Sequence, residues 1–122
     1  MAKPQVAAYG SWQSPITSDL IASGTIGLWQ IALDGQDIYW IELRPQEGGR
    51  NVIVRNTPEG RTVDMLPPPF NARTRVHEYG GGDFTVVDGR IYFSNFIDQR
   101  LYQLKPGSPP HPVTPEGNWR YA

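Results

Sequence analysis

The chain has 122 residues and a formal net charge of −1, with basic and acidic residues interspersed. This length suits one ordinary domain, and the hydrophobic content is that of a globular chain rather than a disordered one. No basic stripe marks a nucleic-acid-binding surface, so we expect no nucleic-acid partner. The absence of cysteine excludes disulfides and thiolate metal sites, and fits a reducing compartment.

The N-terminus does not resemble a targeting segment. Residues 1–8 carry one charge and no long apolar core, unlike a signal peptide. No apolar run approaches the roughly 18 residues typical of a membrane span. We therefore expect a cytoplasmic protein without membrane contact. The many glycines and prolines, spread along the chain, favour turns and disfavour helix.

Residues 1–23 form a lead-in segment before the first strand pattern. Thr17 or Ser18 could cap a short helix over 18–22, because their hydroxyls can satisfy free amides at a helix start. An extended arm is the alternative, and the sequence leaves both open.

Two successive groups of short strands follow. Residues rich in β-branched and aromatic side chains alternate with turn formers, which is typical of antiparallel strands. Pro67-Pro68-Pro69 ends the first group, because proline has no amide hydrogen to give to a ladder. The expected strands are 24–33, 37–43, 50–55 and 61–66 in the first group, and 83–87, 90–95, 100–104 and 111–114 in the second.

The two groups share a pattern. Asp34-Gly35 recurs as Asp88-Gly89, and Ile38-Tyr39-Trp40 recurs as Ile91-Tyr92-Phe93. A period of about 50 residues with four strands per unit is typical of β-propeller blades. The alternative is two β-meanders in a small sandwich. We predict an all-β fold, the first two four-stranded antiparallel blades of an incomplete β-propeller, with a lead-in at 1–23, one blade at 24–76 and a second at 77–122.

The glycine-rich stretch Arg73–Phe84 opens the second unit. Three consecutive glycines favour a bend or a close backbone approach, because glycine lacks a Cβ. The first strand of a blade normally lines the central channel, so residues at its start are candidates to face a peptide. These substrate-channel candidates are Arg73, Arg75, His77, Glu78 and Tyr79. The alternative for His77 and Glu78 is a structural contact at the blade junction, since neighbours on one strand point to opposite faces.

Several kinds of chemistry are absent from the sequence. It has no Gly-x-Ser-x-Gly nucleophile elbow, no Walker loop and no calcium loop. His77 and His111 are not spaced as a zinc pair, so we expect neither metal nor cofactor. The strand aromatics are expected to pack between blades rather than stack on a ligand. They are Trp29, Tyr39, Trp40, Phe84, Tyr92 and Phe93.

The order and spacing of five motifs resemble a known family, the prolyl oligopeptidase (S9) family of serine peptidases. The resemblance is to the N-terminal β-propeller of its dipeptidyl aminopeptidase/acylaminoacyl-peptidase type, and it covers nearly the whole chain. The motifs begin at Tyr9-Gly-Ser-Trp, Ile31-Ala-Leu-Asp-Gly, Glu47-Gly-Gly-Arg-Asn-Val, Arg73-Thr-Arg-Val-His-Glu-Tyr-Gly-Gly-Gly and Ile91-Tyr-Phe-Ser-Asn-Phe.

The resemblance implies a parent in which a seven-bladed propeller precedes an α/β-hydrolase domain and admits short peptides to its Ser, Asp and His. None of these three residues maps onto this chain, so the chain alone is expected to be inactive. Its expected partners are the missing C-terminal hydrolase domain, short peptides bound through the parent, and further copies of itself through exposed blade faces. The alternatives are a non-catalytic propeller that binds a protein or glycan, and a free-standing small β-domain.

Overall fold

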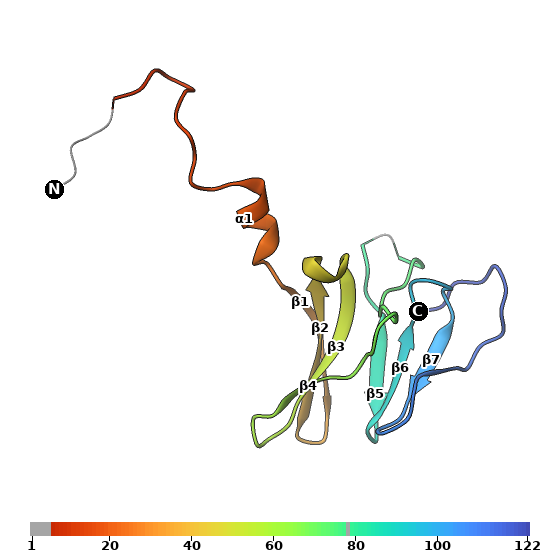
Figure 1. Cartoon of the computed structure of the whole chain (residues 1–122). Coiled ribbons are helices and arrows are strands. Elements are labelled where there is room, and N and C mark those ends of the chain that lie inside the picture. The colour runs from red at the N-terminus through yellow and green to blue at the C-terminus, as the bar shows by residue number, and fades with distance from the viewer. Residues whose placement is uncertain (1–5, 78) are drawn as a thin grey trace.

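The structure is a computed structural model that describes residues 6–77 and 79–122. It contains two four-stranded antiparallel sheets, each with its strands in sequence order, and the two sheets do not close into a ring (Figure 1). The all-β prediction of two blade-like units is confirmed. The first sheet consists of β1 (Gly27–Asp34), β2 (Asp37–Arg44), β3 (Arg50–Asn56) and β4 (Thr62–Asp64). The second consists of β5 (Phe84–Val87), β6 (Arg90–Ser94), β7 (Leu101–Leu104) and β8 (His111–Pro112).

The lead-in contains a short helix, which settles the choice that the sequence left open. Helix α1 (Ser18–Ser23) is capped by Thr17, whose hydroxyl oxygen accepts a 3.1 Å hydrogen bond from the Leu20 N–H. The helix buries no residue, and it extends away from the sheets with the segment before it (Figure 1). A 3-10 turn, η1 (Pro45–Glu47), fills the predicted loop between β2 and β3.

The β1–β2 and β5–β6 hairpins, which we call the inner hairpins, differ in register although both contain Asp-Gly. In the first, Asp34 pairs with Asp37, so Gly35 and Gln36 form the loop. In the second, Val87 pairs with Arg90, and Asp88 and Gly89 form the loop with φ of 49° and 70°. Positive φ at both loop residues is the signature of a type I′ turn. Asp34, the last paired residue before its loop, therefore corresponds to Val87. The predicted equivalence of Asp34 and Asp88 is wrong by one position.

Several strands are shorter than predicted. The first begins at Gly27 rather than 24, the fourth ends at Asp64 rather than 66, and the eighth ends at Pro112 rather than 114. Leu66 lies beyond the ladder, and its side chain is buried in the core, where it is 2% exposed. Strand β1 carries a register shift between Trp29 and Ala32, with Gln30 at a φ of 46°. Such a bulge bends the strand locally.

The two sheets bury opposite faces. Strands β2 and β6 both begin directly after a two-residue loop. In β2 the third and fifth residues, Tyr39 and Ile41, are buried, whereas in β6 the second and fourth, Ile91 and Phe93, are buried. Side chains alternate between the two faces of a strand. The face of the first sheet that packs in the core is therefore opposite, relative to the hairpin, to the face that the second sheet packs there, so the sheets stack front to back. Successive propeller blades stack this way, and a sandwich of two like-facing meanders does not.

The core lies between the sheets and includes the chain that joins them. Phe70, in this connection, packs edge-on against Phe93 and Tyr102 of the second sheet, with ring centres 6.0 and 5.2 Å apart. Of the six aromatics expected between blades, Tyr39, Phe84 and Phe93 are buried. Trp29 departs from that prediction, since half of its surface is exposed although it pairs with the buried Ile41.

Three asparagines hold the connection between the two sheets. The Asn51 side-chain amide donates to the Ala72 carbonyl, and the Asn51 N–H donates to the Asn71 side chain. On the other side the Asn71 N–H donates to the Asn95 side chain, and the Phe96 N–H donates to the Asn71 carbonyl. The connection is therefore hydrogen-bonded to Asn51 of the first sheet and forms an isolated bridge from Ala72 to Asn95 beside the second, which fixes the segment that follows it.

Candidate functional site

The glycine-rich segment 73–83 is anchored at both ends by buried polar groups. Thr74 and Asp83 are 2% and 6% exposed, and the Asp83 carboxylate accepts a 2.7 Å hydrogen bond from the Thr74 N–H. The Asp83 carbonyl accepts from the Ser94 N–H at 2.9 Å. The three glycines between them all have positive φ, of 79°, 102° and 72°. The described part of the segment is therefore a loop closed at its base, and it leads into β5.

Gln30 ties this loop to the first sheet. Its side-chain amide donates to the Phe84 carbonyl at 2.7 Å, and its side-chain oxygen accepts from the Asp83 N–H at 3.1 Å. The bulge in β1 turns Gln30 toward β5. The first strands of the two sheets, β1 and β5, are therefore joined by a side chain instead of by backbone hydrogen bonds. Nothing in the local sequence pattern distinguishes Gln30, because its partners lie more than fifty residues away.

Two concavities flank the loop. The first, about 510 Å³, lies between the sheets, and the loop lines it together with residues of β1, β2 and β3. The second, about 320 Å³, lies on the side of the second sheet and the C-terminal segment. The first is lined by Trp29, Gln30, Leu43, Asn51, Arg73, Tyr79, Gly80, Gly81 and Asp83. The second is lined by Arg73, Thr74, Arg75, His77, Gly80, Phe96 and Arg120, and we call it the basic concavity.

The structure brings most of the predicted channel residues to these two concavities. Arg73 lines both, Arg75 and His77 line the basic concavity, and the fully exposed Tyr79 lines the first. Glu78 lies outside the described residues. Phe96 and Arg120 were not predicted. Phe96 lies in the turn after β6 and Arg120 near the chain end, so neither carried a local signal that would place it here.

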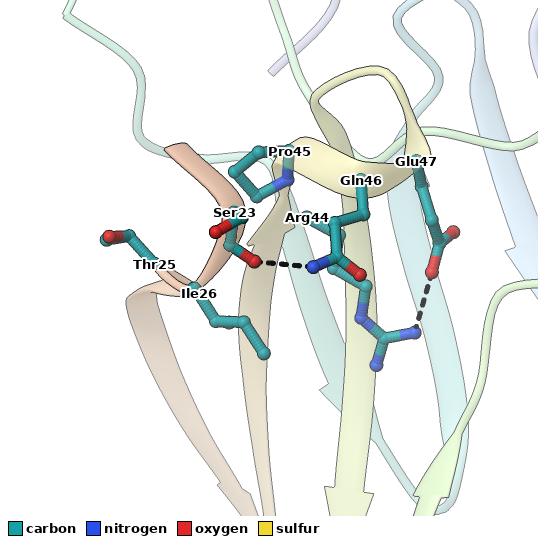
Figure 2. Close-up of a pocket in the computed structure, with 8 residues that line it drawn as sticks. Ser23, Thr25, Ile26, Arg44, Pro45, Gln46 and Glu47 are labelled. Atoms are coloured by element: carbon teal, nitrogen blue, oxygen red, sulfur yellow. Dashed lines mark hydrogen bonds and ion pairs between the residues drawn. The ribbon is translucent and has the colours of Figure 1, made fainter. Parts of the chain in front are cut away.

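A third concavity, of about 300 Å³, lies where α1 meets the end of β2 (Figure 2). Figure 2 shows the Gln46 side chain directed at Ser23, whose carbonyl accepts its hydrogen bond, and the Arg44 guanidinium directed at Glu47. The lining residues are Ser23, Gly24, Thr25, Ile26, Arg44, Pro45, Gln46 and Glu47.

The charges of this third concavity are already paired. Arg44 forms ion pairs with Glu42 at 2.7 Å, Asp64 at 2.6 Å and Glu47 at 3.2 Å. The bond to Arg44 lowers the pKa of Asp64, and bonds to Arg50 and Arg44 lower the pKa of Glu47. Each carboxyl therefore stays ionised and bound to an arginine, which is the behaviour of a structural brace rather than of an acid-base group.

Within residues 6–77 and 79–122, no group of three or more histidine, aspartate or glutamate side chains is placed to hold a metal ion. In the same residues no helix has the length and apolarity needed to span a membrane.

Comparison with solved structures places this fold. The chain is 38% identical to a puromycin-hydrolysing peptidase of Mycobacterium tuberculosis, with a TM-score of 0.81 over 94% of this chain. It is also 38% identical to a puromycin hydrolase, with a TM-score of 0.80 over 92% of this chain. A mutant of puromycin hydrolase complexed with PGG gives the same identity and TM-score. No protein-family model and no curated protein matches the chain.

The matched region is a small part of those peptidases, because the chain spans 18% of the length of each. The match nevertheless covers more than nine-tenths of this chain. The motifs of the sequence and the solved structures thus lead to one assignment. Over nearly its whole length the chain is similar to one part of the puromycin-hydrolysing peptidases, which is consistent with the N-terminal propeller portion of a prolyl oligopeptidase-family (S9) peptidase.

Proposed function

We propose that this chain forms the first two blades of a propeller that controls access of short peptides to the α/β-hydrolase domain of a serine peptidase. The observation that carries the proposal is the 38% identity to puromycin-hydrolysing peptidases over nearly the whole chain. The unclosed sheets agree with it, because a propeller removes such open faces by adding further blades. The serine mechanism follows from the family, and the complex with PGG was obtained with a serine-to-alanine mutant.

The glycine-rich loop supports the gating part of the proposal. It lies at the start of β5, beside the inner strand of the preceding sheet, and presents Arg73, Arg75, His77 and Tyr79 to concavities on both of its sides. In a complete propeller the inner strands surround the channel, so these side chains would meet a peptide on its way to the hydrolase. Charged and aromatic groups there would select among peptides by size and charge.

The first experiment determines the size and reactivity of the native protein. An antibody to the Arg73–Phe84 region should capture from the source cells a species several-fold heavier than 13.7 kDa. That species should react with a fluorophosphonate probe and hydrolyse puromycin and aminoacyl nitroanilides. A native product of 13.7 kDa would contradict the peptidase proposal. A heavier species that the probe does not label would instead favour a non-catalytic binding propeller.

The second experiment tests gating in that heavier species. Tyr79→Ala widens the exposed side of the first concavity without touching the hydrolase, so we expect longer peptides to be cleaved faster relative to an aminoacyl nitroanilide. Tyr9→Ala, which removes an equally exposed tyrosine of the lead-in, serves as the matched control. An unchanged preference for peptide length in Tyr79→Ala would contradict gating by this loop.

A further inference from the structure

The basic concavity holds an unusual concentration of positive charge for a chain whose net charge is −1. Three arginines and a histidine line it, and among the residues that the structure describes no acidic side chain does. The ion pairs that the structure describes are made by four other arginines, which are Arg44, Arg50, Arg55 and Arg100.

Two of these guanidinium groups are held against one aromatic ring. The Cζ atom of Arg75 lies 4.4 Å from the centre of the Phe96 ring, and that of Arg73 lies 5.1 Å from it. Both contacts lie within the range of cation–π attraction. The two charges are therefore closer together than a Debye length, about 10 Å at 0.1 M salt, and repel each other. An anion bound beside them would offset that repulsion.

The backbone that carries the arginines is fixed. The Arg73 N–H donates to the Ser94 carbonyl at 2.9 Å, and the Arg75 N–H donates to the Gln99 side chain at 2.7 Å. Between them the buried Thr74 hydroxyl donates to the Tyr121 carbonyl at 2.6 Å. The two guanidinium groups thus project from a rigid base and are oriented by a ring, so less entropy is lost when they bind a ligand.

We propose that the basic concavity binds a carboxylate of a short peptide, either the C-terminal carboxylate or that of an aspartate or glutamate side chain. A guanidinium group presents paired N–H donors that match the two oxygens of a carboxylate, which makes arginine the usual residue for this recognition. The inference rests on the proposed function and deepens it, because it specifies that the peptides passing the loop carry a negatively charged carboxylate.

The test is a titration of the ¹⁵N-labelled 122-residue chain followed by nuclear magnetic resonance. Acetyl-triglycine is compared with its C-terminal amide, and acetyl-Gly-Glu-Gly-amide with acetyl-Gly-Gln-Gly-amide. The acetyl group removes the amino charge, so the members of each pair differ only in the carboxylate. We expect at least one carboxylate peptide to bind about fivefold more tightly than its neutral partner, the size of an exposed ion pair. The Nε–H signals of Arg73 and Arg75 should shift.

Matched variants separate a local site from a general charge effect. Arg73→Gln and Arg75→Gln should each remove the preference for the carboxylate peptide, while Arg90→Gln, at an exposed arginine of β6, should leave it unchanged. All three side chains are exposed, and the spectra show directly whether each variant remains folded. Which peptide pair responds identifies the source of the carboxylate.

Three outcomes overturn the inference: equal affinity within both peptide pairs, an equal loss in Arg90→Gln, or inorganic phosphate binding as tightly as the carboxylate peptides. The titration measures binding alone and needs no hydrolase domain. A negative result would therefore leave the peptidase proposal standing, and failure of the parent to cleave peptides would not decide the titration.

Discussion

Tyr102 combines a partly buried ring with a charged partner. Its hydroxyl donates a 2.7 Å hydrogen bond to the Asp98 carboxylate, and its ring stacks on Phe93 with centres 5.7 Å apart. Burial, followed by the bond to Asp98, raises the pKa of Tyr102 to about 12. The neutral phenol is thus the form that the folded state favours.

We predict that this tyrosine makes the fold sensitive to alkali. The unfolded phenol ionises near pH 10. The stabilisation is therefore complete below about pH 10 and is lost as the pH rises toward 12. Tyr102→Phe should lower the free energy of unfolding by about 1 kcal/mol at pH 7 through loss of the hydrogen bond. It should also flatten the decline between pH 10 and 12, measured by urea unfolding at each pH.

Tyr9→Phe provides the control, because Tyr9 is fully exposed and lies outside the core. A wild-type chain whose decline above pH 10 matches that of Tyr102→Phe would contradict the assignment.

At the scale of single residues the sequence located the candidate channel segment but not the residues that contact it. Arg73, Arg75, His77, Glu78 and Tyr79 were predicted because they precede the first strand of the second blade, a signal that is local. Gln30 and Phe96 were missed because their roles arise from contacts made only after the sheets pack, and isolated glutamine or phenylalanine residues carry no such signal.

At the scale of elements, Asp34 links the two inner hairpins. Its carboxylate accepts hydrogen bonds from the N–H groups of Asp88, at 3.2 Å, and of Gly89. The end of β1 therefore caps the turn between β5 and β6. This contact adds to the one made by Gln30 near the bulge of the same strand, so β1 is held to the second sheet at two points.

We predict that Asp34→Ala lowers the free energy of unfolding by about 1–2 kcal/mol, because it leaves two turn amides without an acceptor. Asp34→Asn keeps one acceptor oxygen and should lose roughly half of that. The matched control is Asp88→Asn, since asparagine tolerates positive φ and the backbone donor remains. Urea denaturation of the three variants checks the order, and a loss in Asp88→Asn equal to that in Asp34→Ala would count against the contact.

The same hairpins show why strands were predicted more accurately than register. Alternating apolar residues and turn formers located all eight strands to within a few residues. Asp-Gly, however, suits a turn in more than one register, and the bulged β1 pairs so that Asp34 stays in the ladder. The register of each hairpin depends on which face of each strand is buried. The opposite burial of β2 and β6 is a property of the packed pair of sheets, so neither segment shows it by itself.

At the scale of the whole molecule, front-to-back packing leaves one face of each sheet without a partner. On the first sheet, Leu28, Leu33 and Ile38 share the outer face and are 65%, 69% and 41% exposed. Contiguous exposed apolar side chains of this kind mark surfaces that bind another protein surface. In a complete propeller a further blade would cover this face. In the 122-residue chain alone it meets only water or another copy.

We predict that the isolated chain self-associates through this face, so that its sedimentation coefficient increases with protein concentration. The double variant Leu28→Thr, Leu33→Thr introduces β-branched residues suited to a strand while it removes apolar area, and it should sediment as a monomer over the same range. Ile97→Thr, at a loop residue that is 66% exposed but lies outside both sheets, should associate as the wild type does. If the wild type remains monomeric at every concentration, or if Ile97→Thr dissociates as fully as the double variant, the outer face of the first sheet is not the interface.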